Sequence, residues 1–473
     1  MKKLSLLLLF CCLLIACSSQ KTKVDVMIQH GSIIDIVNGE VSSNKILLLN
    51  ADSIYGIIDE VQKSNYTAQN EIDALGKFIL PGLWDNHVHF GGGDSLIQEN
   101  KDLLPLYIAN GITGVRDAAA DIAPSVLQWR DEINRGELFG PRLFTSGPKL
   151  EGYNSVWLGD LEIGTRAEML AAFDSLQKLK VDFVKITDNT ISSEIYLECL
   201  KEAKMRKMKI SGHIPFALTL EQVSDAGLAS VEHLGYALRA GSPQREEVMK
   251  KVAEGKMSPA DATQIFIESF DASLASAAYA KIAANGTAIT PTLKISKTLA
   301  YLDKDDHSRD EYLSYVGPGL VKTYEGRVIR AAQADEAEIA QRHARYEKVK
   351  TLLPLLHQAG VMIIAGTDSG YLNSFVYPGL ALHEELILFV EAGLTPLQAL
   401  QASILSGPKY LGVQDQFGTL ETGKSGDVLI LNGNPLEDIS STQDISTVIL
   451  RGKIYNRQSL DSILLTVKEK ATP

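Results

Sequence analysis

Cysteine is scarce in this chain, and its placement excludes a disulfide framework. Of four cysteines in 473 residues, Cys11, Cys12 and Cys17 lie in or directly after an apolar N-terminal run. Only Cys199 remains for the rest of the chain, so no intramolecular disulfide is available there. Cys199 lies in a segment with helical character, where a small core residue is a better interpretation than a nucleophile.

The chain also lacks an excess of basic residues. It carries 46 Lys and Arg against 58 Asp and Glu, a formal charge of −12. Removal of Lys2 and Lys3 with a leader peptide would change this charge by two, from −12 to −14. Proteins that bind nucleic acid carry basic patches, so this balance argues against nucleic acid as a partner. It says little about small substrates.

A hydrophobic run long enough to span a membrane is missing from the N-terminus. The apolar run over residues 4–16 is shorter than the roughly 20 residues that a spanning helix needs. It ends in Leu14–Cys17, followed by Ser18, and this ending resembles the lipobox of a bacterial lipoprotein. We therefore expect a signal peptide over residues 1–16, lipidation of Cys17 and a polar tether over 17–23. An ordinary secretory signal is the alternative.

The lipobox resemblance also implies a location. Several acyl chains on Cys17 would anchor the protein stably to a membrane. Serine rather than aspartate after Cys17 suggests the outer membrane, so the expected place is the cell envelope, facing the periplasm.

Both ends of the remaining chain have a β pattern. At 473 residues the chain exceeds the roughly 250–300 at which one core stops growing, so a large domain with a smaller companion is expected. Residues 24–80 and 415–473 are predicted to form one small β-sandwich, the second part ending in a C-terminal tail. The turn at Asn38-Gly39 indicates a hairpin. The predicted strands are Val24–Ile28, Ile33–Val37, Lys45–Leu49, Asp427–Leu431 and Thr447–Leu450.

The middle, residues 81–414, alternates strands and helices, which is typical of a parallel sheet. Thr219 and Thr395 each begin a helix with a capping box. A charged stretch over 302–350, within a longer insertion over 295–350, is predicted to be helical and to act as a lid. Eight βα units would close an α/β barrel of the (β/α)8 TIM type. The eight predicted strands are Phe78–Asp85, Gly114–Asp117, Arg142–Thr145, Phe183–Thr187, Lys209–His213, Ser230–His233, Ala288–Pro291 and Val361–Asp368.

Four histidines and an aspartate fall at the ends of these strands, where barrel active sites lie. His87 and His89 follow strand one, His213 ends strand five, His233 strand six and Asp368 strand eight. Alternation along a strand places His87 and His89 on the same face. Neutral imidazole nitrogens are common ligands of Zn²⁺ and similar ions, so this pattern predicts a metal centre. A structural histidine is the alternative for each.

Lys185 joins the candidate centre, and Asp368 has a second possible role there. Lys185 ends strand four, and an unmodified ammonium group would be repelled by a cation. Carbamylation by CO₂ would convert it to an anion able to bridge two metals, whereas a surface or salt-bridged lysine is the alternative. Asp368 can bind metal and also accept a proton from metal-bound water. A turn-capping aspartate is the other interpretation, which Ser369-Gly370 would also suit.

Several of these segments resemble the amidohydrolase superfamily. The resemblance covers nearly all of residues 24–456, and the branch it favours is the imidazolonepropionase-like group that includes binuclear Xaa-Pro dipeptidases. Phe417–Asp427 is similar to that branch's return into its β-sandwich. The matching motifs are Pro81–His89, Phe183–Ile186, Gly212–His213, Val231–His233 and Gly366–Asp368.

The resemblance implies a binuclear hydrolase of carbon–nitrogen bonds. His87, His89 and Asp368 would hold the more buried of two divalent ions, expected to be Zn²⁺. His213 and His233 would hold the second ion, and carbamylated Lys185 would bridge the two ions. A metal-bridging hydroxide would attack an amide carbonyl, and Asp368 would pass the proton to the leaving amine. Lys185 favours this branch over its mononuclear relatives.

The substrate is less constrained. Where dipeptidases of this branch commonly carry a Gly-Gly-His segment, this chain reads Leu150–Trp157. A dipeptide or another amide is the main prediction. A cyclic amide, a lactone or another ester stays open, as does a deaminase, which Lys185 argues against. An inactive binding or scaffold lipoprotein is the alternative outside enzymes. A homo-oligomer is also left open.

Further side chains are candidates for contact with a small-molecule or short-peptide substrate. Tyr236, three residues after His233, is predicted to reach a substrate carboxylate or the developing oxyanion. Tyr153 is predicted to line the pocket, although plain packing is the more common role for such an aromatic. Arg116 and Asp117 end strand two and are interpreted as a structural pair.

Overall fold

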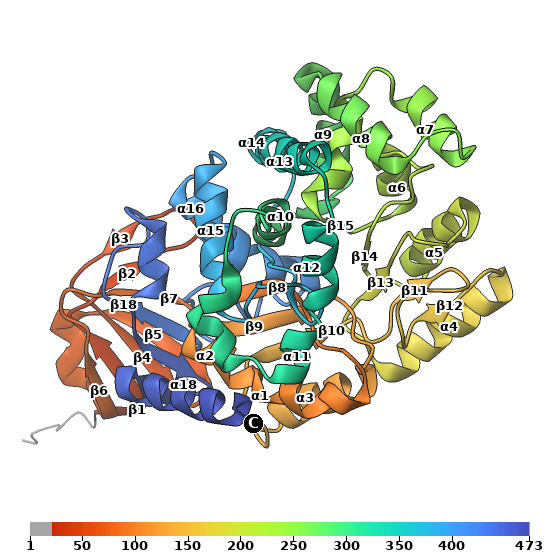
Figure 1. The fold of residues 1–473 in the computed structure, drawn as a ribbon. Coiled ribbons are helices and arrows are strands. Elements are labelled where there is room, and N and C mark those ends of the chain that lie inside the picture. Colours follow the sequence, from red (N-terminus) through yellow and green to blue (C-terminus); the bar gives the residue numbers. More distant parts are fainter. Residues whose placement is uncertain (1–20, 473) are drawn as a thin grey trace, which may run out of the picture.

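The computed structural model describes residues 21–472. Both ends of this range contribute strands to two sheets that lie together in Figure 1, where red β1–β6 stand beside blue β18. The first sheet has the order β5-β4-β1-β6 and the second β20-β19-β18-β7-β2-β3. The strands are β1 (Thr22–Gln29), β2 (Ser32–Ile34), β3 (Val41–Ser42), β4 (Lys45–Asn50), β5 (Ser53–Asp59), β6 (Tyr66–Asp73), β7 (Phe78–Pro81), β18 (Val428–Leu431), β19 (Ile445–Leu450) and β20 (Lys453–Asn456).

One apolar cluster is shared by these two sheets. Ile28 and Leu47 of the first sheet belong to the same buried cluster as Ile79, Val428 and Ile449 of the second. The alternating apolar pattern at both ends of the chain therefore buries a common core. Their arrangement as a sandwich stays a prediction. The hairpin expected at Asn38-Gly39 is confirmed, because β2 and β3 pair antiparallel across it and Gly39 has φ 79°.

The middle of the chain forms two sheets in which every strand pair is parallel. Their orders are β10-β9-β8-β17 and β12-β11-β13-β14-β15-β16. Backbone contacts link both edges of the first sheet to the second: Asp182 N donates to Thr145 O at 2.9 Å, and Ile289 forms a parallel bridge with Ile363. The strands are β8 (Leu83–His89), β9 (Ile112–Asp117), β10 (Arg142–Thr145), β11 (Leu150–Glu151), β12 (Leu161–Glu162), β13 (Val184–Ile186), β14 (Ile210–Gly212), β15 (Ser230–Glu232), β16 (Ala288–Thr290) and β17 (Ser369–Gly370). The predicted α/β class with parallel sheets is confirmed.

Two predicted strands were wrong in detail. The strand expected over 78–85 is divided at Gly82, so that β7 pairs with β18 and β8 begins the parallel sheet. Gly82 lies so close to Thr113 that an added Cβ would be 2.2 Å from its hydroxyl oxygen. The segment expected as a strand over 361–368 is not a continuous strand, although it forms a parallel bridge between Ile363 and Ile289 and backbone hydrogen bonds to Asn86 and His87 of β8.

Helices follow most of the parallel strands, and their starts match the sequence signals. Thr219 and Thr395 form the predicted capping boxes at α6 and α16, and Cys199 is fully buried in α5. The helices are α1 (Ile97–Asp102), α2 (Leu104–Ala109), α3 (Ala123–Asn134), α4 (Arg166–Leu179), α5 (Ser193–Met205), α6 (Leu220–Ala226), α7 (Arg245–Ala253), α8 (Pro259–Glu268), α9 (Ala272–Ala284), α10 (Leu293–Ala300), α11 (Pro318–Lys322), α12 (Glu325–Ala332), α13 (Glu336–Lys350), α14 (Leu352–Gln358), α15 (Leu380–Glu391), α16 (Pro396–Ile404), α17 (Ser406–Leu411) and α18 (Arg457–Ala471).

Short 3₁₀ helices fill several connections. They are η1 (Glu60–Asn65), η2 (Asp94–Leu96), η3 (Leu234–Gly241), η4 (His307–Arg309), η5 (Glu311–Tyr315) and η6 (Ile439–Gln443). The insertion after β16 is helical as predicted, running from α10 to α13. The C-terminal tail forms the helix α18, which buries Leu460 and Val467 and packs on α2. Among residues 21–472, no helix is both long and apolar enough to span a membrane.

Candidate metal centre

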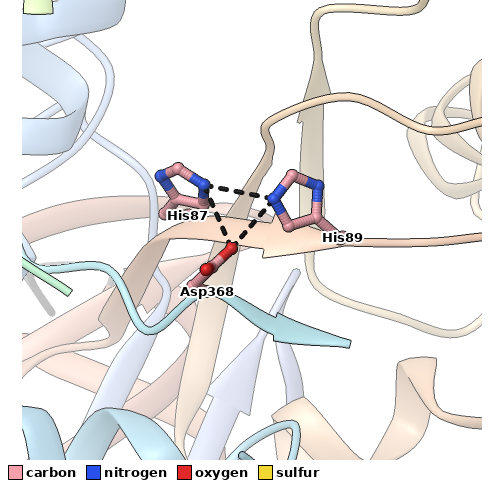
Figure 2. Close-up of side chains that lie close together, drawn as sticks. All are labelled: His87, His89 and Asp368. Atoms are coloured by element: carbon pink, nitrogen blue, oxygen red, sulfur yellow. Dashed lines mark hydrogen bonds and ion pairs between the residues drawn. The ribbon is translucent and has the colours of Figure 1, made fainter. Parts of the chain in front are cut away.

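Three of the predicted ligands meet at the end of β8. His87 Nε2 lies 3.2 Å from His89 Nε2, and Asp368 Oδ1 lies 3.4 Å and 3.0 Å from these two nitrogens (Figure 2). His87 is fully buried and Asp368 is 7% exposed. Three potential ligand atoms this close together, from residues nearly three hundred positions apart, form a group that can hold one metal ion.

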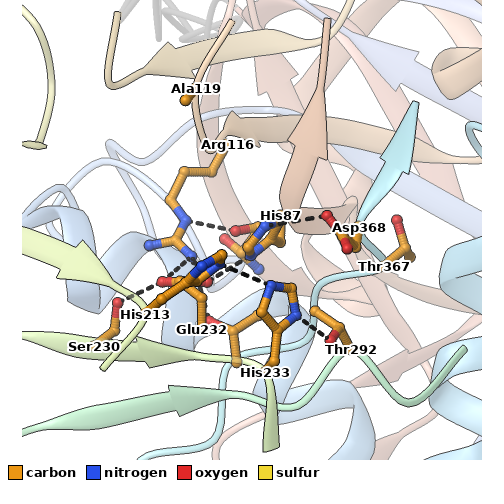
Figure 3. A network of polar contacts seen from close by, with 12 residues as sticks. His87, Arg116, Ala119, His213, Ser230, Glu232, His233, Thr292, Thr367 and Asp368 are labelled. Carbon is orange, nitrogen blue, oxygen red and sulfur yellow. Dashed lines mark hydrogen bonds and ion pairs between the residues drawn. The ribbon is translucent and has the colours of Figure 1, made fainter. Parts of the chain in front are cut away.

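The other two predicted histidines meet beside this group. His213 Nε2 and His233 Nε2 are 3.1 Å apart, at the ends of β14 and β15. The His233 ring lies 5.3 Å from the His87 ring, so the two groups adjoin, as Figure 3 shows. The structure therefore brings together the four histidines and the aspartate that the sequence singled out.

Each of the four imidazoles is held through its Nδ1 atom. His87 Nδ1 contacts Glu232 Oε2 at 2.5 Å, and His89 Nδ1 contacts the carbonyl of Ala119 at 2.9 Å. The remaining pairs are His213 Nδ1 with Asp188 Oδ1 at 3.3 Å and His233 Nδ1 with Thr292 Oγ1 at 2.8 Å. A partner at Nδ1 orients the ring and directs Nε2 toward a ligand. The four Nε2 atoms accordingly face inward.

Electrostatics keep the second pair of histidines neutral. Burial lowers the pKa of His213 and, more strongly, that of His233. Burial would raise the pKa of Asp368, but its contacts with His87 and His89 hold that pKa well below the usual range. The second pair thus supplies neutral imidazoles beside an ionised carboxylate, which is the protonation that metal binding requires.

Lys185 lies buried at the same place without a partner. It is 1% exposed on β13, and its Nζ atom forms no hydrogen bond within the described chain. Burial lowers its pKa to about 8, opposed by the charges of Glu232 and Asp368. Lysine is rarely buried without a charge partner. The burial of Lys185 without a hydrogen-bond partner is consistent with its predicted position among the ligands.

Backbone strain gathers at the centre. His233, Asp368, Ala119 and Thr292 are non-glycine residues with φ of 74°, 63°, 113° and 49°. Two of them are predicted ligands, and the other two contact the Nδ1 atoms of ligand histidines. Such conformations cost of order 1–3 kcal/mol each and persist where surrounding contacts enforce them.

A buried ion pair behind His87 was missed by the sequence analysis. Arg116 Nη2 lies 3.0 Å and 2.9 Å from the two carboxylate oxygens of Glu232, and both residues are fully buried. The expected pairing of Arg116 with Asp117 is wrong, because alternation turns these neighbours to opposite faces of β9 and Asp117 accepts from Thr145 instead. A glutamate inside an apolar strand, directly before a ligand histidine, was the available signal.

Asp85 attaches the irregular segment before Asp368 to β8. Its carboxylate accepts from the Thr367 hydroxyl at 2.7 Å and from the Thr367 amide at 3.1 Å. Burial raises the pKa of Asp85 to about 7. Together with the backbone hydrogen bond from Asp368 N to His87 O, this contact holds the segment that carries Asp368 against β8.

A cavity of about 640 Å³ opens at the second pair of histidines. His233 and Asp368 line it together with Tyr236, whose hydroxyl donates to Asp188 at 2.9 Å and whose ring stacks on His213. Asp188, one residue beyond the predicted end of strand four, was also missed. The residues that line the cavity are Asp188, Ile214, Phe216, His233, Gly235, Tyr236, Leu238, Arg239, Pro259, Ala260, Thr263, Phe266, Ile295, Ser296, Leu299, Ala300, Arg327, Arg342, Arg345, Tyr346, Val349 and Asp368.

Tyr153, a further candidate, lies elsewhere. Tyr153 is 46% exposed, outside the lining of this cavity, and its hydroxyl donates to Glu168 at the start of α4. Its predicted substrate contact stays a prediction without geometric support. Cys17, the predicted lipidation site, falls outside the described residues.

Comparisons with known proteins agree with this geometry. The amidohydrolase family model matches residues 78–455, most of the chain. The chain belongs to the amidohydrolase family. The prediction of a metal-dependent hydrolase of amide bonds is confirmed at this level.

The relatives in the family are distant. Ochratoxinase of Aspergillus niger is 24% identical over 441 residues, covering 80% of this chain and 75% of that protein. An adenine deaminase of Geobacillus kaustophilus is 30% identical over only 101 residues, 21% of this chain and 16% of that protein.

Solved structures show the same fold. A Xaa-Pro dipeptidase with bound methionine has a TM-score of 0.66 at 22% identity, covering 91% of this chain and 99% of that one. Bottromycin amidohydrolase reaches a TM-score of 0.71 at 18% identity, covering 94% and 90%. At these identities the likeness shows the fold alone.

Proposed function

We propose that the chain is a binuclear metal-dependent hydrolase that cleaves the amide bond of dipeptides or N-acyl amino acids. One observation carries the proposal: four imidazole Nε2 atoms and the Asp368 carboxylate converge at one end of the parallel sheets, each ring anchored at Nδ1. The family match supports amide chemistry, and the dipeptidase fold is consistent with a small peptide substrate.

The side chains present suit two divalent ions. His87, His89 and Asp368 would hold one ion, and His213 with His233 the other, as nitrogen and oxygen ligands suited to Zn²⁺. Bound ions would lower the pKa of water and polarise the substrate carbonyl. In each pair of histidines the two Nε2 atoms lie about 3 Å apart, close enough to bind one ion together.

Lys185 would complete the centre as a carbamate. Its buried amine has no partner of its own, which is the state from which addition to CO₂ proceeds. The ammonium group first loses one proton, and the lone pair of the neutral amine then forms the N–C bond with CO₂. A second proton leaves the nitrogen as the carbamate forms, so a cationic side chain would become an anionic one. This change also supplies the negative charge that two buried divalent ions require.

The protein's own groups would then carry the proton. Asp368 turns Oδ1 toward His87 and His89, which leaves Oδ2 to accept a proton from water in the cavity. It would hand that proton to the leaving amine nitrogen, as a general base and then a general acid. Tyr236, with its hydroxyl in the same cavity, is proposed to orient the substrate.

The sheet order supports a closed barrel, and the N-terminal sequence supports a location in the cell envelope. We infer that the two linked parallel sheets close as a (β/α)8 barrel and that the terminal sheets form a sandwich beside it. The lipobox-like Leu14–Cys17 supports an enzyme anchored in the cell envelope. Mass spectrometry of the membrane fraction, comparing Cys17→Ala with the full chain, would test the anchor.

Metal analysis tests the centre directly. We expect close to two ions per chain in the wild type and about one or fewer in Lys185→Ala, with amide hydrolysis lost in the variant. Lys178→Ala is the matched control, because Lys178 is exposed near the end of α4. A metal-free wild type that still hydrolyses dipeptides would refute the proposal. Equal metal content in Lys185→Ala and the control would refute the bridging role.

A substrate panel tests the bond type. Dipeptides, N-acyl amino acids, lactones and simple esters would be compared at equal concentration by kcat/KM. Faster turnover of amides is expected, and exclusive turnover of lactones or esters would shift the assignment to the alternative.

A further inference from the structure

The helical insertion places three arginines on the wall of the active-site cavity. Arg327 comes from α12, and Arg342 and Arg345 come from α13. We call these three residues the arginine wall. Three guanidinium groups on one side of a cavity give it a strong positive charge.

The arginine wall has no counter-ion in the described chain. None of its members forms an ion pair within residues 21–472, and Arg342 Nε and Nη2 are buried atoms without a hydrogen-bond partner. The neighbouring carboxylate of Asp303 pairs with His343 at 2.9 Å instead. Buried charged donors left unpaired are costly, so this arrangement is suited to an anion that arrives with a ligand.

The carboxylates that line the cavity are already engaged at the metal centre. Asp188 accepts from Tyr236 and contacts His213, while Asp368 contacts His87 and His89. Arg239 also lines the cavity, but its guanidinium donates to the backbone carbonyls of Ile214, Pro215 and Phe216. Arg239 is therefore held by the backbone, whereas the guanidinium groups of the insertion are free to bind an anion.

The arginine wall and the metal centre share the same cavity. A Cβ added at Gly235 would lie 3.4 Å from Arg345 Nη2, next to Tyr236. The charge of Asp368 acts on Arg327, whose pKa is lowered by burial. Apolar side chains fill the lining between these polar groups, among them Phe216, Leu299 and Val349.

We propose that the arginine wall binds the free carboxylate of the substrate while the apolar lining holds its side chain. The substrate class would be a dipeptide or N-acyl amino acid with an apolar residue and an unblocked carboxyl terminus. Arg342 is the principal specificity residue, since its guanidinium can form paired hydrogen bonds to a carboxylate. The substrate assignment rests on the proposed amide hydrolysis, whereas carboxylate binding does not.

Paired substrates test the specificity. We would compare kcat/KM for N-acetyl-L-phenylalanine and its carboxamide in the wild type, Arg342→Ala and Arg342→Lys. Replacement of Arg342 by alanine should lower kcat/KM for the acid about 10- to 100-fold, the range for losing hydrogen bonds to a charged group. The loss should fall mainly on KM, the carboxamide should be unaffected, and lysine should restore part of the activity. Arg330→Ala is the control, because Arg330 lies exposed on α12 outside the cavity lining.

Direct binding separates the two proposals. Calorimetry would measure binding of N-acetyl-L-phenylalanine to the full chain as purified, for the wild type, Arg342→Ala and Arg327→Ala. Binding that is weakened about tenfold or more in both variants, without any hydrolysis, would support the wall and count against the proposed function. Equal turnover of acid and carboxamide, with Arg342→Ala unchanged, would overturn the wall and leave the hydrolase intact. Absence of carboxylate binding in the wild type would also overturn it.

Discussion

The buried pair of Arg116 and Glu232 offers the sharpest test of how the metal centre is held. Both side chains are fully buried, and Glu232 also contacts His87 Nδ1 at 2.5 Å. Burial alone would raise the pKa of Glu232, but Arg116 and His87 hold it well below its usual range. The carboxylate is therefore charged in the folded protein, and its nearest compensating charge is Arg116.

Replacement of Arg116 by methionine removes that charge but keeps an apolar stem. The guanidinium lies over the rings of Phe183 and Tyr410 at 5.0 Å and 4.8 Å, so a methionine would still fill this space. Loss of one partner of a buried pair costs about 3–5 kcal/mol, because the other charge stays buried without compensation. We expect the free energy of unfolding to fall by that amount in Arg116→Met.

The position of His87 should be affected as well. Glu232 orients His87, and loss of such a supporting contact typically weakens metal affinity by roughly 10- to 100-fold. Urea unfolding followed by circular dichroism, with chelator and then with Zn²⁺, separates the effect on the fold from the effect on the metal. A competition assay with a chromophoric chelator measures the affinity.

A double-mutant cycle isolates the pair. Glu232→Gln removes the second charge, so Arg116→Met/Glu232→Gln should be less destabilised than the sum of the single variants, with a coupling of about 1–3 kcal/mol. Arg135→Met is the control, because its pair with Glu137 is exposed and should leave unfolding unchanged. An Arg116→Met protein within about 1 kcal/mol of the wild type would refute the reasoning.

Two further predictions concern the packing around the site. His383 is buried between Thr442 and Asn110, and burial lowers its pKa to about 4 from an ordinary value of 6.5. Because the unfolded chain binds this proton more readily, the free energy of unfolding should fall by about 3 kcal/mol as the pH drops from 6.5 to 4. His383→Gln should lack this part of the acid sensitivity in urea unfolding at several pH values, and an unchanged profile would contradict the assignment. Gly82→Ala should lower the free energy of unfolding by about 1–3 kcal/mol, because its Cβ would lie 2.2 Å from the Thr113 hydroxyl oxygen. Gly56→Ala is the control, because its Cβ would have its nearest neighbour at 3.7 Å, and it should unfold in urea like the wild type.

The sequence by itself determined which histidines and which aspartate converge at the candidate metal centre. Residues at the carboxyl ends of successive parallel strands meet at one edge, so His87, His213 and His233 could be grouped from their strand positions alone. Alternation placed His87 and His89 on one face, and the capping residues Thr219 and Thr395 marked helix starts correctly. These features depend on local periods of two or 3.6 residues, which a single chain displays directly.

Only the tertiary structure decided what surrounds those ligands. Arg116 and Glu232 are 116 positions apart, and their pairing depends on how the two parallel sheets that carry β9 and β15 come together. The contact of Thr367 with Asp85, 282 positions earlier, holds the segment before Asp368 against β8, and the apolar pattern of that segment alone does not indicate it. The direction of Arg342 into the cavity depends on how α13 packs against η3, and a helical charge pattern alone is equally compatible with a solvated face. Local periodicity sets which side chains can share a face, but long-range packing selects their partners.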